Sequence, residues 1–277
     1  MLYDFHIHTT CSDGTFTPEE VVCMAKERQL SAIAITDHDT VSGLEAGAEK
    51  AKEVGIDFIN GIEFSTEYYG KEVHIVGLFL NIKDEKFLSK IEQLRKDRVI
   101  RAEETIRKLE QYKIFITMED ILKEAKGDVI GRMHIANVLY KKGYVRDRKE
   151  AFAMYLGDHC SAYVPKKNLT PKEAVKIIKD NGGLSFIAHP KLITLGQEKV
   201  IALIDELCGE GLDGLEAFYP SFSDIDTGYY KRIAETRGIL TGGGSDFHGK
   251  NRDDVGIGSI KLPEDILEKM ISRKQKK

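Results

Sequence analysis

The stretch YDFHIHTTCSDG, residues 3–14, decides the fold of this 277-residue chain and opens its chemistry. The chain begins with a strand-like run, Leu2–His8, in which His6 and His8 stand two positions apart. Side chains two apart on a strand project from the same face, so the two imidazoles can bind one cation. Asp13 follows in a Ser-Asp-Gly sequence, where it serves either as a third ligand or only as a turn residue.

Two further blocks place ligand-type side chains in or after apolar runs. Asp37 and His38 directly follow an apolar run, at the point where a buried strand is expected to end. Asp39 and Thr40 are expected to start the next helix rather than to bind metal. Glu63 lies between apolar neighbours, where an unpaired carboxylate is costly, and bridging two cations would remove that cost.

The carboxyl-terminal part of the chain repeats the opening pattern. Asp246 and His248 stand two positions apart after another apolar run and a series of glycines. The remaining blocks hold His74, His189 and the pair Arg132 and His134. Nitrogen and oxygen ligands in this number indicate a multinuclear metal centre. Because divalent cations activate water and bind phosphoryl oxygens, the pattern points to metal-dependent hydrolysis of a phosphoester.

Seven strand-like runs alternate with helical patterns along the chain. The runs are Leu2–His8, Ala32–Thr36, Phe58–Phe64, Val73–Phe79, Leu184–His189, Gly214–Phe218 and Ile239–Gly242. This alternation predicts parallel strand pairing, although the run that carries His74 can instead turn back antiparallel to its predecessor. Two helices are expected to begin with capping sequences, Thr17-Pro18-Glu19-Glu20 and Thr170-Pro171-Lys172-Glu173.

Strand signals are absent between about Lys86 and Pro165, where helical patterns continue. We therefore expect a helical insertion domain at 86–165 that contributes to the substrate pocket, inside a metal-binding body formed by 1–85 and 166–277. Ligand-type side chains at or just beyond strand ends suit an α/β barrel whose active site lies at the carboxyl ends of its strands.

The composition limits which classes of partner and which cellular compartment are expected. The net charge of −4 is small for this length, so overall charge indicates neither a nucleic-acid surface nor a membrane surface. Four cysteines without paired spacing, and an amino terminus without a signal-peptide pattern, predict free thiols and a cytoplasmic protein. No apolar run approaches about 18 residues, so no membrane contact is expected. No obligate protein partner is evident.

Four blocks, HIHTTCSDG, ITDHD, AHP and GSDFH, resemble the motifs of the PHP family, the polymerase and histidinol phosphatase group of metallophosphoesterases. The resemblance runs through almost the whole chain and implies an α/β fold, a distorted (β/α)7-type PHP barrel with a helical insertion. Within the family the chain is most similar to stand-alone nucleotide phosphatases of the TrpH/YciV type. These carry a helical insertion with a Gly-Arg-x-His segment, here Gly131-Arg132-Met133-His134.

The resemblance also implies nine ligands for two or three divalent metal ions, Mn²⁺, Fe²⁺ or Zn²⁺. By motif position, a first cation uses His6, His8, Glu63 and Asp246, a second uses Glu63, His74 and His189, and a third uses Asp13, His38 and His248. Some family members have His at the position of Asp13, so the third site differs from theirs.

The implied substrate is a phosphorylated nucleotide or a short oligonucleotide. A metal-bridging hydroxide would remove the 3′-phosphate of nucleoside 3′,5′-bisphosphates or trim 5′-phosphorylated RNA, as a 5′-3′ exoribonuclease does. Arg132 and His134 would bind phosphate from the insertion, and His134 or His189 would protonate the leaving group. Without the family, Arg132 on a solvated helix and His134 as a helix cap are equally good interpretations. Arg98 and Arg101 are expected to face solvent.

Other interpretations stay open. His159, Lys166 and Lys167 are expected at the surface. A histidinol-phosphate phosphatase would share the metal motifs and differ in its substrate pocket. An amidohydrolase would need a bridging lysine after a central strand, and the sequence offers no clear candidate. A non-catalytic metal-binding accessory domain, as in modules fused to DNA polymerases, is the alternative of another class.

Overall fold

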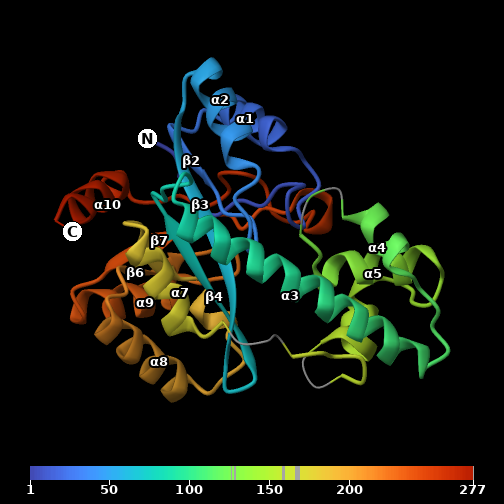
Figure 1. The fold of residues 1–277 in the computed structure, drawn as a ribbon. Coiled ribbons are helices and arrows are strands. Elements are labelled where there is room, and N and C mark those ends of the chain that lie inside the picture. The colour runs from blue at the N-terminus through green and yellow to red at the C-terminus, as the bar shows by residue number, and fades with distance from the viewer. Residues whose placement is uncertain (126, 128, 158–159, 166–168, 277) are drawn as a thin grey trace.

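The computed structural model describes residues 1–125, 127, 129–157, 160–165 and 169–276 and shows a seven-stranded barrel with a helical lobe at one side (Figure 1). The strands are β1 (Tyr3–Asp4), β2 (Ala32–Ile35), β3 (Asp57–Tyr68), β4 (Lys71–Leu78), β5 (Leu184–Ile187), β6 (Gly214–Phe218) and β7 (Leu240–Gly243). Each strand overlaps one of the seven runs expected from the sequence. The α/β barrel with a helical insertion is therefore confirmed.

The helices of the barrel surround its strands. They are α1 (Pro18–Glu27), α2 (Leu44–Val54), α7 (Pro171–Asp180), α8 (Gln197–Glu210), α9 (Asp224–Thr236) and α10 (Ile266–Gln275), with short 3-10 turns η2 (Pro190–Leu192) and η3 (Gly249–Asn251). The capping boxes expected at Thr17 and Thr170 are present, and each hydroxyl accepts a hydrogen bond from the amide of the glutamate three residues later. These caps fix the starts of α1 and α7.

Neighbouring strands follow chain order from β1 to β7. Strands β1 to β3 are parallel, as are β5 to β7, whereas β4 is antiparallel to both of its neighbours. Parallel pairing throughout is thus wrong for β4, and the antiparallel alternative for the run with His74 is confirmed. The reason is the short connection: Tyr69 and Gly70, with φ of 49° and 70°, turn the chain directly back beside β3. A parallel partner would need a long crossover.

The loops that follow β1 and β7 close the barrel. The amide of His8 donates to the carbonyl of Phe247 at 2.9 Å, and the amide of Asp246 donates to that of His6 at 2.8 Å. Strand β1 is shorter than expected. Its pairing with β2 ends at Asp4, and the following residues 6–8 pair with the loop after β7 instead. A Cβ at Gly244 would lie 2.4 Å from the amide nitrogen of His6, so only glycine permits this approach.

The helical lobe starts with a long helix, α3 (Glu85–Glu110), that leads away from the barrel (Figure 1). It continues with α4 (Met118–Glu124), α5 (Arg132–Lys141), α6 (Arg148–Ala151) and the π-helix η1 (Phe152–Leu156). These helices share a hydrophobic core of their own, which includes Leu109, Ile121 and Leu139. A separate core fits an inserted domain, and its boundaries at 86 and 165 stay a prediction.

Three hydrophobic clusters pack against the strands of the barrel. Helices α1 and α2 pack on one outer side with Ile33 and Ile35, and α7 to α9 pack on another with Ile187. Ile266 of α10 belongs to the cluster that fills the barrel interior with Phe5 and Phe186. Helix α10 and the helical lobe lie at opposite sides of the molecule (Figure 1). All four cysteines are free thiols, as expected.

Candidate metal centre

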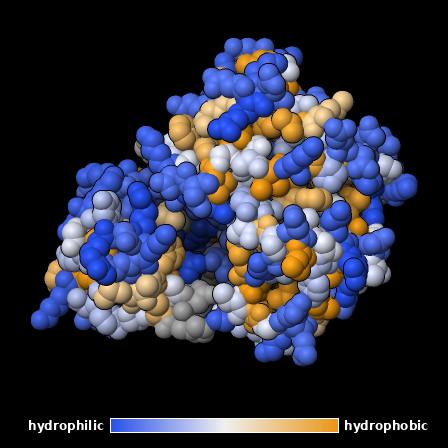
Figure 2. All heavy atoms as spheres, turned by 180° about the vertical axis from the view of Figure 1, so that it is seen from behind, coloured by the Kyte–Doolittle hydropathy of each residue, from blue (hydrophilic) through white to orange (hydrophobic). Residues whose placement is uncertain are grey.

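Nine acidic and imidazole side chains converge where the strands of the barrel end. They are His6, His8, Asp13, His38, Glu63, His74, His189, Asp246 and His248. His6 and His8 follow β1, His38 follows β2, and Glu63 lies within β3. The structure therefore brings together every residue that the sequence placed in the ligand set. Figure 2 shows a hydrophilic hollow between the barrel and the helical lobe.

Glu63 lies at the middle of the cluster and is almost fully buried. Its Oε1 is 3.1 Å from His74 Nδ1, 3.2 Å from His189 Nε2 and 3.3 Å from His6 Nε2, and its Oε2 is 3.1 Å from His38 Nδ1 and 3.2 Å from His8 Nε2. Both oxygens thus face imidazole nitrogens on different sides. This geometry suits a carboxylate that bridges two cations, and it removes the cost of an isolated buried charge.

Asp246 and Asp13 supply carboxylates on the other sides of the histidine cluster. Asp246 Oδ1 is 3.2 Å from His8 Nε2 and 3.5 Å from His248 Nδ1. Asp13 Oδ1 is 3.3 Å from His248 Nε2, and its Oδ2 is 3.9 Å from His38 Nε2. Asp13 therefore does more than make a turn, because its carboxylate faces the same imidazoles.

The ligand atoms fall into four groups in which all atoms lie within 4.8 Å of one another. The groups are His8, Asp13, His38 and His248; His6, His8 and Asp246; His6, Glu63 and His189; and His38, Glu63 and His74. The first adds His8 to the expected third set. The expected second set, Glu63, His74 and His189, is divided between two groups. Glu63 and His189 lie with His6, whereas Glu63 and His74 lie with His38.

The chemistry of these side chains fits divalent cations. The described ligand set holds nitrogen and oxygen donors and no sulfur. Among the described residues, His189 Nδ1 is a buried nitrogen without a hydrogen-bond partner, and such an orphaned atom is costly unless a ligand satisfies it. Imidazole and carboxylate ligands suit Mn²⁺, Fe²⁺ and Zn²⁺ without a choice among them.

Mutual electrostatics keep the carboxylates ionised. Burial alone would raise the pKa of Glu63, but His74 and the other imidazoles around it hold that pKa well below its usual range. Burial opposes protonation of His8, yet Asp246 and Glu63 raise its pKa to about 10. Burial dominates at His38 and lowers its pKa to about 3. The centre therefore offers anionic oxygens, which are the form that binds cations.

Glu216 is a residue that the sequence reasoning missed. It lies on β6, is 2% exposed, and its Oε1 is 2.8 Å from His6 Nδ1. Its Oε2 accepts the backbone N–H of His189 at 2.8 Å, where the backbone is strained at φ 28°. One carboxylate thus holds two members of the cluster. The signal was available: Glu216 is an acid within an apolar strand, as Glu63 is.

Tyr219 and Arg252 were missed as well, and both hold Asp246. The Tyr219 hydroxyl donates to Asp246 Oδ2 at 2.6 Å, and Arg252 Nη1 donates to the same oxygen at 2.7 Å. This leaves Oδ1 to face the imidazoles. Asp37 also supports the centre from outside, because it accepts hydrogen bonds from the amide and hydroxyl of Thr9. Such outer contacts orient ligands.

Three arginines of the helical lobe line a pocket beside the centre. The pocket is bordered by Asp13, His38, Ser65, Glu72, His74, Arg98, Arg101, Gly131, Arg132, Met133 and Phe152. The expectation that Arg98 and Arg101 face solvent is wrong. Arg98 Nε donates to Asp39 at 2.8 Å, and Arg101 Nε donates to the carbonyl of Val164 at 2.7 Å. Both point inward because buried oxygens of neighbouring segments accept from them.

Asp39 has a different role from the one expected. Helix α2 begins at Leu44 with Gly43 as its cap, so Asp39 does not start that helix. Its carboxylate accepts the amide of Ser65 at 3.0 Å as well as the Arg98 guanidinium. Asp39 therefore links the barrel to helix α3.

Arg132 and His134 lie at the start of helix α5 but differ in their surroundings. Arg132 reaches the pocket, where it contacts Glu72 and stacks on Phe152 and Tyr163. His134 is 3% exposed, and its Nδ1 accepts the amide of Gly131 at 3.0 Å, as a helix cap does. Burial lowers the pKa of His134, so its imidazole is neutral. His159, Lys166 and Lys167 lie outside the described residues.

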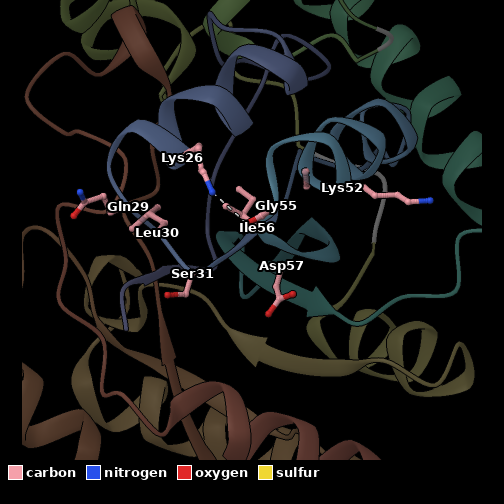
Figure 3. A pocket seen from close by; sticks show the side chains of 9 residues that line it. Lys26, Gln29, Leu30, Ser31, Lys52, Gly55, Ile56 and Asp57 are labelled. Atoms are coloured by element: carbon pink, nitrogen blue, oxygen red, sulfur yellow. Dashed lines mark hydrogen bonds between the residues drawn. The ribbon is translucent and has the colours of Figure 1, made fainter.

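A second hollow lies at the amino ends of β2 and β3 (Figure 3). It is lined by Lys26, Gln29, Leu30, Ser31, Ala51, Lys52, Gly55, Ile56 and Asp57, none of which belongs to the cluster. Lys26 donates to the carbonyl of Gly55, so Lys52 and Asp57 are the other charged side chains of this lining. The described chemistry of the molecule is therefore concentrated at the carboxyl ends of the strands.

Comparison with known proteins gives a consistent result. The family model described as PHP domain matches residues 4–165. A 3′,5′-nucleoside bisphosphate phosphatase from Chromobacterium violaceum is 32% identical over 256 residues, which cover 91% of this chain and 90% of that protein. A 5′-3′ exoribonuclease from Haemophilus influenzae is 34% identical over 261 residues, 91% of this chain and 95% of that protein.

Solved structures support the fold. An amidohydrolase from Chromobacterium violaceum, solved with bound sulfate and no metal, has a TM-score of 0.89 and 30% identity, with 99% of this chain and 97% of that chain covered. A candidate metal-dependent phosphoesterase from Bifidobacterium adolescentis has a TM-score of 0.87 and 29% identity, with coverage of 98% and 96%. Within the described residues, no helix is both long enough and apolar enough to cross a membrane.

Proposed function

This chain belongs to the PHP domain family, and we propose that it removes the 3′-phosphate from nucleoside 3′,5′-bisphosphates and trims short 5′-phosphorylated RNAs. It is a hydrolase of phosphate esters, as the names of its relatives indicate. The observation that carries the substrate assignment is the pocket in which metal-ligand side chains and three arginines face one another. Such a pocket suits a substrate with two separated phosphates.

The nine clustered side chains would hold two or three divalent cations. By motif position, His6, His8, Glu63 and Asp246 would hold the first, Glu63, His74 and His189 the second, and Asp13, His38 and His248 the third. The geometry adds His8 to the third set and groups His74 with His38 rather than His189. When bound, such cations lower the pKa of water towards about 7 and neutralise charge on phosphoryl oxygens. Glu63 fits the bridging position because each of its oxygens faces a different side of the cluster.

The arginine cluster, defined as Arg98, Arg101 and Arg132, would bind the phosphate that is not cleaved. A guanidinium can donate two parallel hydrogen bonds to a phosphate. Arg132 is held ready for this by the rings of Phe152 and Tyr163, with its Cζ 5.7 Å and 5.6 Å from the ring centres. The scissile phosphate would then lie at His38 and the other cluster residues that border the same pocket.

The two imidazoles expected to protonate the leaving group have different surroundings. His189 faces Glu63 within the cluster, and its Nδ1 has no partner among the described residues. His189 therefore keeps its catalytic assignment as a prediction. We assign His134 a positioning role instead, because its Nδ1 caps the helix that starts at Arg132. His134 thus acts on the substrate through Arg132.

The pocket also weighs against the alternatives. Histidinol phosphate carries a single phosphate, so it would leave the arginine cluster without a second phosphate to bind. None of the described pocket residues is a lysine, so the bridging lysine of an amidohydrolase still has no candidate. A non-catalytic domain would not need a phosphate-binding pocket beside a complete ligand set.

The role of Arg132 can be tested with two substrates. For Arg132→Lys we expect kcat/KM for adenosine 3′,5′-bisphosphate to fall by about ten- to a hundredfold, since hydrogen bonds to charged groups contribute about 1.5–3 kcal/mol. Turnover of adenosine 3′-monophosphate, which lacks the second phosphate, should fall much less. Arg146→Lys, in an exposed part of the same lobe, is the matched control. An equal loss with both substrates would show that Arg132 does not bind the second phosphate.

A further inference from the structure

Glu72 is an acid in a pocket that otherwise suits anions. It lies on β4, two residues before His74, so both side chains project from the same face of the strand. One Glu72 oxygen contacts Arg132 Nη2, and the other is 3.5 Å from His74 Nε2. The side chain is a quarter exposed and borders the pocket together with both of these neighbours. Glu72 therefore stands between the metal-ligand cluster and the arginine cluster.

A carboxylate at this place needs a chemical reason. It repels a phosphate and neutralises part of the charge of Arg132, so it weakens the binding of any anion nearby. An ionised carboxylate can only accept hydrogen bonds. The partner of Glu72 should therefore be an uncharged hydrogen-bond donor of the substrate. This donor should belong to the part of the substrate that lies between its two phosphates. In a nucleoside 3′,5′-bisphosphate, the part between the two phosphates is the ribose.

We propose that Glu72 accepts a hydrogen bond from the ribose 2′-hydroxyl and makes this site selective for ribonucleotides over deoxyribonucleotides. The inference rests on the proposed function. In the ribose, the 2′-hydroxyl is adjacent to the 3′-phosphate. In the pocket, Glu72 is adjacent to His74, which belongs to the cluster where the 3′-phosphate would bind, so Glu72 would lie beside the 2′-hydroxyl. It is also the group by which proteins distinguish RNA from DNA. Acidic side chains recognise ribose hydroxyls in the same way in dinucleotide-binding folds.

Arg132 would then have two functions. Its guanidinium has several donors, so it can hold the Glu72 carboxylate in place and still present N–H groups to a phosphate. The competing role for Glu72 is to orient His74 as a metal ligand, since carboxylates often accept the second N–H of such imidazoles. The two roles predict different results, because orientation of His74 affects every substrate and the bound metal.

The test compares adenosine 3′,5′-bisphosphate with its 2′-deoxy analogue. We expect the wild-type protein to prefer the ribonucleotide by about tenfold or more in kcat/KM, the size of one hydrogen bond to a charged group. In Glu72→Met, which has no acceptor, the ratio of the ribonucleotide to the deoxyribonucleotide value should fall to about one, because the loss of the carboxylate charge changes phosphate binding equally for both substrates. Glu72→Gln, which keeps an acceptor oxygen, should retain part of the preference. Glu119→Gln, at an exposed site of the lobe, is the control.

Metal content per chain, measured on the same preparations, separates the remaining outcomes. It should be equal in the wild-type protein and in both Glu72 variants. Equal losses with both substrates, together with less bound metal, would overturn the inference in favour of a role in orienting His74. Wild-type protein that hydrolyses both substrates equally well would also overturn it. Hydrolysis of neither substrate would overturn the proposed function itself, and the inference with it.

Discussion

Asp246→Ala is expected to reduce phosphoester turnover by more than about a hundredfold while the fold is retained. Asp246 Oδ1 faces the imidazoles of His6 and His8 at 3.4 Å and 3.2 Å, which is the arrangement of ligands around one cation. Loss of residues that only orient ligands costs about ten- to a hundredfold, so loss of a direct ligand should cost more. Phosphate release at saturating metal measures the effect, and bound metal per chain should fall with it.

The fold should survive this change because Asp246 lies in a loop and contributes little to the hydrophobic clusters. Circular dichroism and a thermal melt would verify this. Asp253→Ala, at an exposed position of the same loop, is the matched control and should behave like the wild-type protein. Full activity of Asp246→Ala at saturating metal would contradict the assignment of the centre.

Glu216→Gln is expected to weaken metal binding and activity by about ten- to a hundredfold, the usual effect of losing an outer-shell partner. An ionised carboxylate only accepts, so Glu216 Oε1, 2.8 Å from His6 Nδ1, keeps a proton on that nitrogen. His6 Nε2 is then free to bind a cation. In glutamine, the amide oxygen is needed by the N–H of His189, so the NH2 group faces His6 Nδ1.

The amide of glutamine would thus impose the opposite tautomer on His6. Its Nδ1 would accept a hydrogen bond, and its Nε2 would carry the proton and lose its capacity as a ligand. Titration of the metal-free variant with Mn²⁺ measures the affinity, and nitrogen chemical shifts of the His6 ring report the tautomer. Glu235→Gln, at an exposed position of helix α9, is the control. Wild-type metal affinity in Glu216→Gln would show that Glu216 is not a positioning residue.

The sequence was most informative where local patterns decide the structure. Apolar runs located all seven strands, and the Thr-Pro capping sequences located the starts of α1 and α7. Ligand-type residues at strand ends could be predicted to form one site, because the carboxyl ends of barrel strands meet at one face. Glu63 and His74 lie within β3 and β4 rather than at strand ends, yet all nine side chains converge.

The residues that escaped prediction depend on tertiary contacts. Arg98 looks like a solvated position on a charged helix, and only the folded chain brings Asp39 next to it. The apolar neighbours of Glu216 mark it as an unusual acid, but only the fold shows that it accepts from His6 and His189, which are far from it in the chain. Likewise, only the three-dimensional structure shows that Glu63 belongs to two groups of ligand atoms. Local patterns thus indicate which residues matter, and the fold decides which of them touch.

The central claim is that the nine clustered side chains form a metal centre that hydrolyses a phosphate ester of a nucleotide. The most direct test is phosphate release from adenosine 3′,5′-bisphosphate by protein prepared free of metal, before and after addition of Mn²⁺. We predict negligible release without metal, release of the 3′-phosphate after addition, and adenosine 5′-monophosphate as the other product. Equal release with and without Mn²⁺ and in the presence of a chelator, or metal binding without any release, would contradict the account.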